Sequence, residues 1–190
     1  VFPTLDCASC ITTPKMAAAA HHDNITVFTY CDITALERQD GKLTAAVTQK
    51  PRYEDAQKCI GCRQCEYQCP IYVPDKEQGG FSATKAIAIP FSNAIPQTAV
   101  LDEENCMLCG RCAKVCPTNA IDYFQKPASF RIQADSVVLA TGFEITPLDD
   151  KVQYGGGQIP NVITALQMER LLAPHGPYNR VLRPSDGMEP

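Results

Sequence analysis

The stretch Cys59-Ile-Gly-Cys62-Arg-Gln-Cys65-Glu-Tyr-Gln-Cys69-Pro70 decides the fold of this 190-residue chain. It recurs as Cys106-Met-Leu-Cys109-Gly-Arg-Cys112-Ala-Lys-Val-Cys116-Pro117. Both runs have the spacing C-x2-C-x2-C-x3-C-P, which binds a [4Fe–4S] cluster. Two such runs predict two clusters in one chain, and two neighbouring clusters indicate the transfer of single electrons.

The spacing also predicts which cysteines share a cluster. Three thiolates separated by two residues each can hold one cluster within a tight loop, whereas the fourth cysteine of each run ligates the other cluster. The predicted ligand sets are therefore crossed. Cluster I takes Cys59, Cys62, Cys65 and Cys116, and cluster II takes Cys106, Cys109, Cys112 and Cys69.

Two other uses of these cysteines are disfavoured. Structural zinc sites usually present C-x2-C pairs separated by a longer spacer, whereas here four cysteines fall within eleven residues, twice. A small secreted disulfide fold would contain a larger share of cysteine than 11 in 190, and no export signal is visible. These features favour a reducing cytoplasm as the location of the protein.

Composition excludes several classes of function. The formal net charge is −4 and the basic residues are scattered, which disfavours a nucleic-acid surface. No apolar run approaches the roughly 20 residues that span a bilayer. The chain begins at Val1 instead of Met, and we expect it to be part of a longer protein.

The flanks of the cysteine runs have a mixed α/β pattern. Before them, a helix is predicted from Thr12 to Ala20, and strands over Asn24–Tyr30 and Leu43–Thr48. Between the runs, Glu77–Thr98 is expected to form a loop and hairpin. After them, a fully buried strand is predicted to end at Phe143, through the apolar run Val137–Phe143, and residues 163–172 are predicted to form a helix.

Several stretches together resemble the A-subunit family of heterodisulfide reductase, whose members are FAD and iron–sulfur proteins of methanogens and many anaerobic bacteria. The similarity is carried by both cysteine runs and by Phe2–Cys10, Thr13–Met16, Lys50–Tyr53, Val138–Phe143, Pro160–Thr164 and Arg183–Gly187. The resemblance implies an α+β fold in which a bacterial-type two-[4Fe–4S] ferredoxin domain is inserted into part of a thioredoxin-reductase-like α/β flavoprotein domain. The implied boundaries are 1–51 for the first flavin-domain part, 52–127 for the ferredoxin insertion, and 128–190 for the second part with its proline-rich tail.

The same resemblance implies an FAD contact at Ala140, Thr141 and Gly142, where the glycine allows a close backbone approach. The Gly-rich dinucleotide fingerprint is missing from these 190 residues, so FAD is expected in the complete protein. Cys7 and Cys10 form a further C-x2-C pair. It is interpreted as half of a third cluster site, as a redox dithiol, or as two ordinary cysteines.

The function that follows is electron relay within one part of an oxidoreductase. By resemblance, the clusters connect FAD with a ferredoxin-like carrier, and other subunits of a redox complex are the expected partners. No residue has the setting of an acid–base or nucleophilic catalyst. The alternatives are a related flavin and iron–sulfur subunit of another anaerobic complex and a free-standing ferredoxin-type carrier.

Overall fold

The computed structural model describes residues 8–39, 41–178 and 180–190. The chain divides into two compact units. The first, which we call the cluster unit, consists of residues 16–72 and 85–141 and contains both cysteine runs. The second, the tail unit, consists of residues 73–84 and 142–190 with the described residues up to Lys15. The structure is mixed α/β, as predicted.

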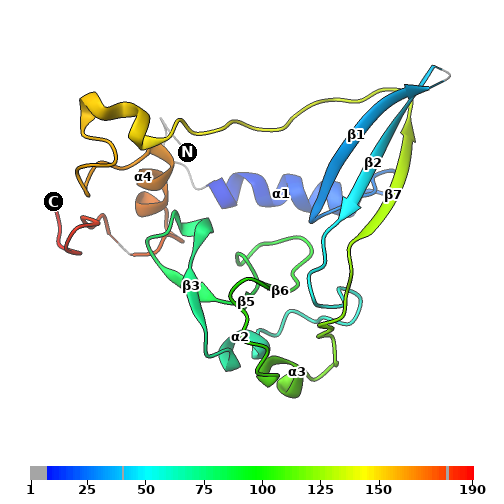
Figure 1. Ribbon diagram of the computed structural model, residues 1–190, viewed down its shortest axis with the longest axis horizontal. Helices are drawn as coiled ribbons and strands as arrows, with labels where there is room; N and C mark the ends of the chain where they lie inside the picture. Colours follow the sequence, from blue (N-terminus) through cyan, green and yellow to red (C-terminus); the bar gives the residue numbers. More distant parts are fainter. Residues whose placement is uncertain (1–7, 40, 179) are drawn as a thin grey trace. The chain divides into compact units, whose positions relative to one another are not determined.

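An antiparallel sheet forms one part of the cluster unit (Figure 1). Its strands are β1 (Cys31–Gln39), β2 (Lys42–Gln49) and β7 (Ala128–Ala134), with β2 in the centre. The predicted strand over Leu43–Thr48 is therefore confirmed. A tight turn between β1 and β2 contains Gly41, whose φ of 79° lies in the left-handed region.

The predicted strand over Asn24–Tyr30 is wrong. Those residues have no strand structure, and β1 begins directly after them at Cys31. The turn explains the shift, because it pairs Gln39 with Lys42 and carries the register to Cys31 opposite Gln49. All of β2 is then occupied by Cys31–Gln39, so β-branched and aromatic composition upstream finds no partner there.

The predicted buried strand through Val137–Phe143 is also wrong. The strand in this region is β7, which ends at Ala134. Val138 is 89% exposed, Leu139 77% and Phe143 81%. β7 pairs with β2, whereas no described strand pairs with Val137–Phe143. The run is extended but lacks the hydrogen-bonded neighbour that defines a strand.

The helices at the two ends of the chain differ in how well sequence predicted them. α1 (Ala8–Ala20) includes residues before the expected start at Thr12, with Pro14 inside it. α4 (Ala165–Leu172) confirms the predicted C-terminal helix. Its start is fixed by a capping box, in which the Thr164 hydroxyl accepts from the Gln167 amide and the Gln167 side chain accepts from the Thr164 amide.

Short elements occupy the space between the two cysteine runs, in agreement with the expected loop and hairpin. They are β3 (Tyr72–Pro74), η1 (Lys76–Gln78), β4 (Ala83–Lys85), β5 (Ile87–Ala88) and β6 (Val100–Leu101). β3 pairs with β4, and β5 pairs with β6. A further 3-10 segment, η2 (Leu148–Tyr154), precedes α4 in the tail unit.

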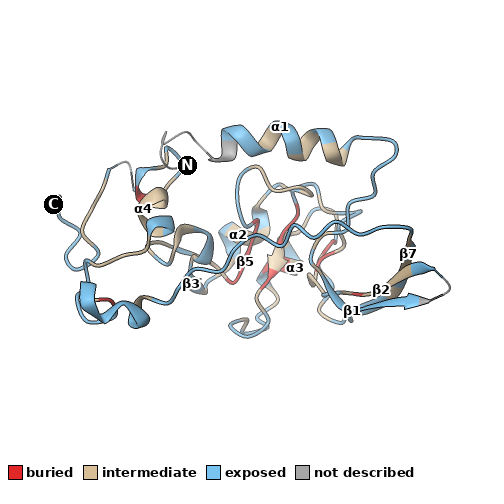
Figure 2. Ribbon diagram, turned by 90° about the horizontal axis from the view of Figure 1, so that it is seen from above, coloured by how far each residue is buried: buried red, intermediate tan, exposed pale blue. Residues whose placement is uncertain are grey.

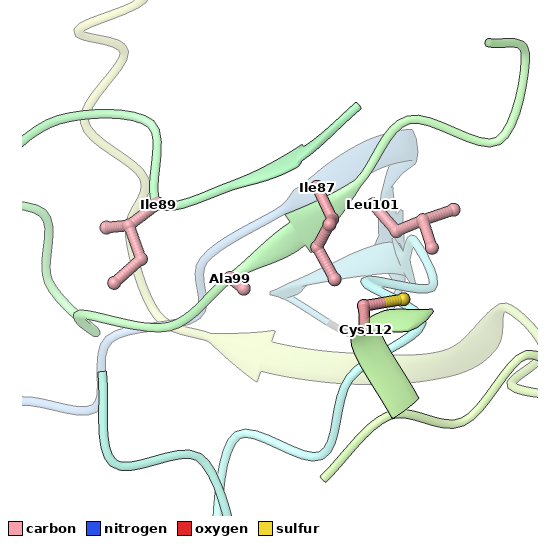
Figure 3. Close-up of a cluster of buried hydrophobic side chains, with 5 residues drawn as sticks. All are labelled: Ile87, Ile89, Ala99, Leu101 and Cys112. Carbon is pink, nitrogen blue, oxygen red and sulfur yellow. The ribbon is translucent and has the colours of Figure 1, made fainter. Parts of the chain in front are cut away.

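The buried core of the cluster unit is small and surrounds β5 and β6 (Figures 2 and 3). Its members are Ile87, Ile89, Ala99, Leu101 and Cys112. Ile87 is 1% exposed. Cysteine and tyrosine side chains of the two runs and their flanks pack against this core, namely Tyr53, Cys65, Cys69, Cys106 and Tyr123. Side chains of the cysteine runs thus make up much of the interior, which limits how much stability apolar burial alone can provide.

Candidate iron–sulfur site

Each cysteine run folds as a loop followed by one short helix. α2 (Gln64–Gln68) contains Cys65, and α3 (Arg111–Val115) contains Cys112. The fourth cysteine of each run, Cys69 or Cys116, is the residue at which the helix ends. The two helices lie side by side (Figure 1).

The loops repeat the same backbone conformation. In the first run Gly61 and Arg63 have positive φ angles of 66° and 60°. In the second run the equivalent residues, Leu108 and Gly110, have φ angles of 52° and 74°. Each loop therefore contains two left-handed residues, one of which is glycine. The other, Arg63 or Leu108, is held in a conformation that costs roughly 1–2 kcal/mol.

The structure gathers the cysteines into two hollows, each lined by three cysteines of one run and the fourth cysteine of the other. The first hollow contains Cys59, Cys62, Cys65 and Cys116. The second contains Cys106, Cys109, Cys112 and Cys69. These groupings match the ligand sets predicted for clusters I and II, and we refer to the hollows as hollow I and hollow II.

The chemistry of the walls suits a cluster with several irons. Apart from the thiols, the walls are mainly small or apolar, with Ala99, Ala120 and Ile121 in hollow I and Ala86 and Ile87 in hollow II. No disulfide joins any of the eight thiols. In the part of the chain that the structure describes, no three His, Cys, Asp or Glu side chains meet at a point that could hold a single ion. The thiols instead surround a space, which is how [4Fe–4S] clusters are held.

A strand-like contact brings the end of the second run to the start of the first. Glu54 and Ile121 form an antiparallel bridge, and the Asp55 amide donates to the Ala120 carbonyl at 2.7 Å. This contact carries Cys116 into hollow I. The equivalent contact at hollow II is the pairing of Ile87 with Leu101.

Hydrogen-bond donors point at several sulfurs. The Ala120 amide donates to Cys116 Sγ at 3.3 Å, and the Leu108 amide donates to Cys106 Sγ at 3.4 Å. The Tyr123 hydroxyl lies 3.0 Å from Cys112 Sγ. A thiolate ligand can only accept, so Tyr123 would donate to it once iron is bound. Donors of this kind stabilise charge on sulfur and tune the cluster.

Burial controls the ionisation of the free thiols. It raises the pKa of Cys65 to about 12, and it raises the pKa of Cys59 and of Cys112. At Cys116 burial acts in the same direction, but donors including the Ala120 amide outweigh it and lower the pKa. Buried thiols of this kind are protonated until a cation replaces the proton, which is the behaviour expected of metal ligands.

Glu54 is a further member of hollow I that sequence reasoning missed. It is 1% exposed, and neither carboxyl oxygen has a hydrogen-bond partner within the described residues. Burial raises the pKa of this carboxyl. Tyr123 in hollow II was also missed. Counting outward from the two cysteine runs would have revealed Glu54, because it stands where the second run has Leu101.

The other predicted site residues lie elsewhere. Ala140, Thr141 and Gly142 are exposed, and Gly142 has a left-handed φ of 78° with open space where a side chain would stand. Cys7 lies outside the described residues, and Cys10 is exposed on α1. Cys31, on β1, is partly buried and donates to the Thr29 carbonyl.

Comparison with known proteins agrees with this geometry. A family model described as a 4Fe-4S dicluster domain matches residues 58–120. The whole chain is 39% identical to part of the A-subunit of the H2:CoB-CoM heterodisulfide, ferredoxin reductase of Methanothermobacter marburgensis. It is 39% identical to part of the A-subunit of the ferredoxin:CoB-CoM heterodisulfide reductase of Methanosarcina mazei, over 192 aligned residues. The corresponding A-subunit of Methanococcus maripaludis, whose enzyme is named for H2 or formate, is 42% identical.

These alignments cover 100% of the chain but only 24–29% of each relative. The similarity therefore concerns one segment of a longer kind of subunit. In the described part of the chain, no helix has the length and apolar character needed to cross a membrane.

Proposed function

Because the chain corresponds over its full length to part of the heterodisulfide reductase A-subunit and contains a 4Fe-4S dicluster domain, we propose that it carries electrons between redox centres of a similar oxidoreductase. The eight thiols of hollows I and II would hold two [4Fe–4S] clusters, and each cluster would accept and release one electron at a time. The residues of the chain bind and position these clusters and exclude water from them.

The observation that carries this proposal is the crossed grouping of the thiols. Cys116 lies in hollow I with the first run, and Cys69 lies in hollow II with the second. Crossing means that each cluster would be held by both halves of the repeat. The two clusters would consequently be close neighbours, which suits rapid transfer between them.

The test is to replace one crossed thiol at a time in the complete protein. Cys69→Ser should disturb the cluster held by Cys106, Cys109 and Cys112, although Cys69 belongs to the other run. Electron paramagnetic resonance of the reduced protein should then show the spin–spin interaction weakened or lost, together with less iron per chain. Cys31→Ser is the matched control, because it removes a thiol outside both hollows, and its iron content should not change.

A wild-type protein that binds zinc, or that binds only one cluster, would contradict the proposal. So would a Cys69→Ser protein with unchanged iron and unchanged spin interaction.

The electron donor and acceptor of the clusters are a further part of the proposal. We propose that FAD, bound by the complete protein, exchanges electrons with the clusters, and that a ferredoxin-like carrier and other subunits are its partners. The names of the relatives support this, since they include ferredoxin and heterodisulfide reductase. The FAD contact at Ala140, Thr141 and Gly142 and the insertion into a thioredoxin-reductase-like domain belong to the same proposal.

Flavin content separates this proposal from a free-standing electron carrier. The complete protein should contain FAD together with iron, whereas a simple carrier would contain iron and sulfide alone. Co-purifying subunits would distinguish a heterodisulfide-reductase-like complex from another anaerobic redox complex. The third-cluster proposal for Cys7 and Cys10 predicts that Cys7→Ser lowers iron per chain; unchanged iron would reject it.

A further inference from the structure

The repeat extends beyond the cysteines, and it differs in one buried position. Glu54 stands five residues before Cys59, and Leu101 stands five residues before Cys106. An aspartate follows in both copies. The two positions therefore correspond in sequence.

They also correspond in structure. Glu54 bridges to Ile121, and both residues line hollow I. Leu101 pairs with Ile87, and both residues line hollow II (Figure 3). The isoleucine is thus the same in the two copies, whereas its partner is a carboxylic acid in one and an aliphatic residue in the other.

Glu54 cannot easily escape from this position. Its backbone is held by the bridge to Ile121 and by Gln125, whose side-chain amide donates to the Glu54 carbonyl at 3.1 Å. The side chain is 1% exposed, close to the 4% of Leu101. A buried polar group without a partner is costly, by roughly 2–7 kcal/mol for an uncharged one. The wall of hollow I is therefore an expensive place for a carboxyl that has no role there.

We propose that Glu54 makes the two clusters unequal by setting the reduction potential of cluster I. The potential of an iron–sulfur cluster depends on nearby charge, on hydrogen bonds to sulfur and on burial. A carboxyl provides either a charge or a hydrogen-bond donor, whereas leucine provides neither. This inference rests on the proposed cluster binding, and it adds that the two clusters would not share an electron equally.

Tyr123 gives an independent handle on the other cluster. Its hydroxyl lies 3.0 Å from Cys112 Sγ and lines hollow II. Loss of a hydrogen bond to a ligand sulfur should lower the potential of cluster II. Tyr123→Phe therefore identifies which measured potential belongs to cluster II.

The test is a redox titration of the complete, cluster-loaded protein, followed by electron paramagnetic resonance. Glu54→Leu gives hollow I the residue found in hollow II. We expect it to change the equilibrium constant for electron exchange between the clusters at least tenfold, which is about 59 mV for one electron. The potential that moves should be the one that Tyr123→Phe leaves in place. Asp55→Asn is the matched control, since it removes the neighbouring carboxylate, which is partly exposed and paired with Lys58, and it should change the constant less than about twofold.

Two results would overturn the inference: potentials within about twofold of the wild type in equilibrium constant despite full iron content, or an equal movement of both clusters. If Glu54→Leu fails to load both clusters, Glu54→Met, an unbranched apolar replacement, is measured against the same criteria. A wild-type protein without two clusters would refute the proposed function itself. Two clusters that do not respond to Glu54 would refute only the inequality.

Discussion

The side chain of Gln125 ties the segment before the first cysteine run to the segment after the second, and its removal has a calculable effect. Its Oε1 accepts from the Arg52 and Tyr53 amides, both at 2.7 Å, and its Nε2 donates to the Glu54 carbonyl at 3.1 Å. A typical hydrogen bond contributes about 1 kcal/mol to stability. Gln125→Ala should therefore weaken this contact by about 3 kcal/mol, or somewhat less where water replaces the lost partner.

Hydrogen exchange measures the effect directly. A change of about 3 kcal/mol corresponds to roughly a hundredfold change in the opening equilibrium, because each tenfold change requires about 1.4 kcal/mol. In the cluster-loaded protein, the amides of Arg52 and Tyr53 should exchange faster by up to this factor. Cluster I should also be lost sooner in denaturant, since the same contact brings Cys116 to hollow I.

A matched control separates this tie from a general loss of a glutamine. Gln97→Ala removes one hydrogen bond, from Gln97 Nε2 to the Ser92 carbonyl at 2.9 Å, within the loop between the runs. It should leave exchange at Arg52 and Tyr53 unchanged. If Gln125→Ala also changed those two amides by less than about threefold, the tie would not hold the segment, and the reasoning would be refuted.

Two further predictions concern the loops and the thiols. Gly61→Ala should lower the melting temperature and the iron content more than Gly110→Ala: both strain a left-handed residue, but only a Cβ at Gly61 would lie 2.8 Å from the Gln97 carbonyl oxygen. Equal losses in the two variants would contradict this. In iron-free protein, burial raises the pKa of Cys65 to about 12, so above the usual thiol pKa of about 8.5 the unfolded chain loses a proton that the folded chain keeps. Stability measured by urea unfolding should therefore fall from about pH 8.5 upward, and Cys65→Ser should flatten that slope; a wild-type slope equal to that of Cys65→Ser would reject the assignment.

The grouping of the cysteines could be predicted because it depends on short-range geometry. A three-residue spacing places successive thiols around one loop, and a helix of five residues carries the fourth cysteine away from it. These features are set by residues close in sequence. Local spacing was therefore sufficient to anticipate which thiols share hollow I and which share hollow II.

The neighbours of the thiols depend on contacts between distant parts of the chain, which a single motif does not encode. Tyr123 reaches Cys112 because the chain after the second run returns past α3, and Gln125 reaches Arg52 across 73 positions. Glu54 is different, because the sequence contained a usable signal. The two copies serve as their own alignment, and the exchange of leucine for glutamate at a buried position is visible once the comparison is carried five residues upstream.

The two failed strand predictions have one physical cause. Val137–Phe143 and Asn24–Tyr30 have the composition of strands, yet neither is paired, whereas β7 and β1 beside them are. β2 has one edge for each neighbour, and the register of the sheet assigns those edges to Cys31–Gln39 and Ala128–Ala134. Composition measures how well a segment would fit a sheet, but a strand exists only where an edge remains to be filled. The exposed apolar side chains of Val138, Leu139 and Phe143 therefore mark a segment that retains strand composition without a partner edge among the described residues.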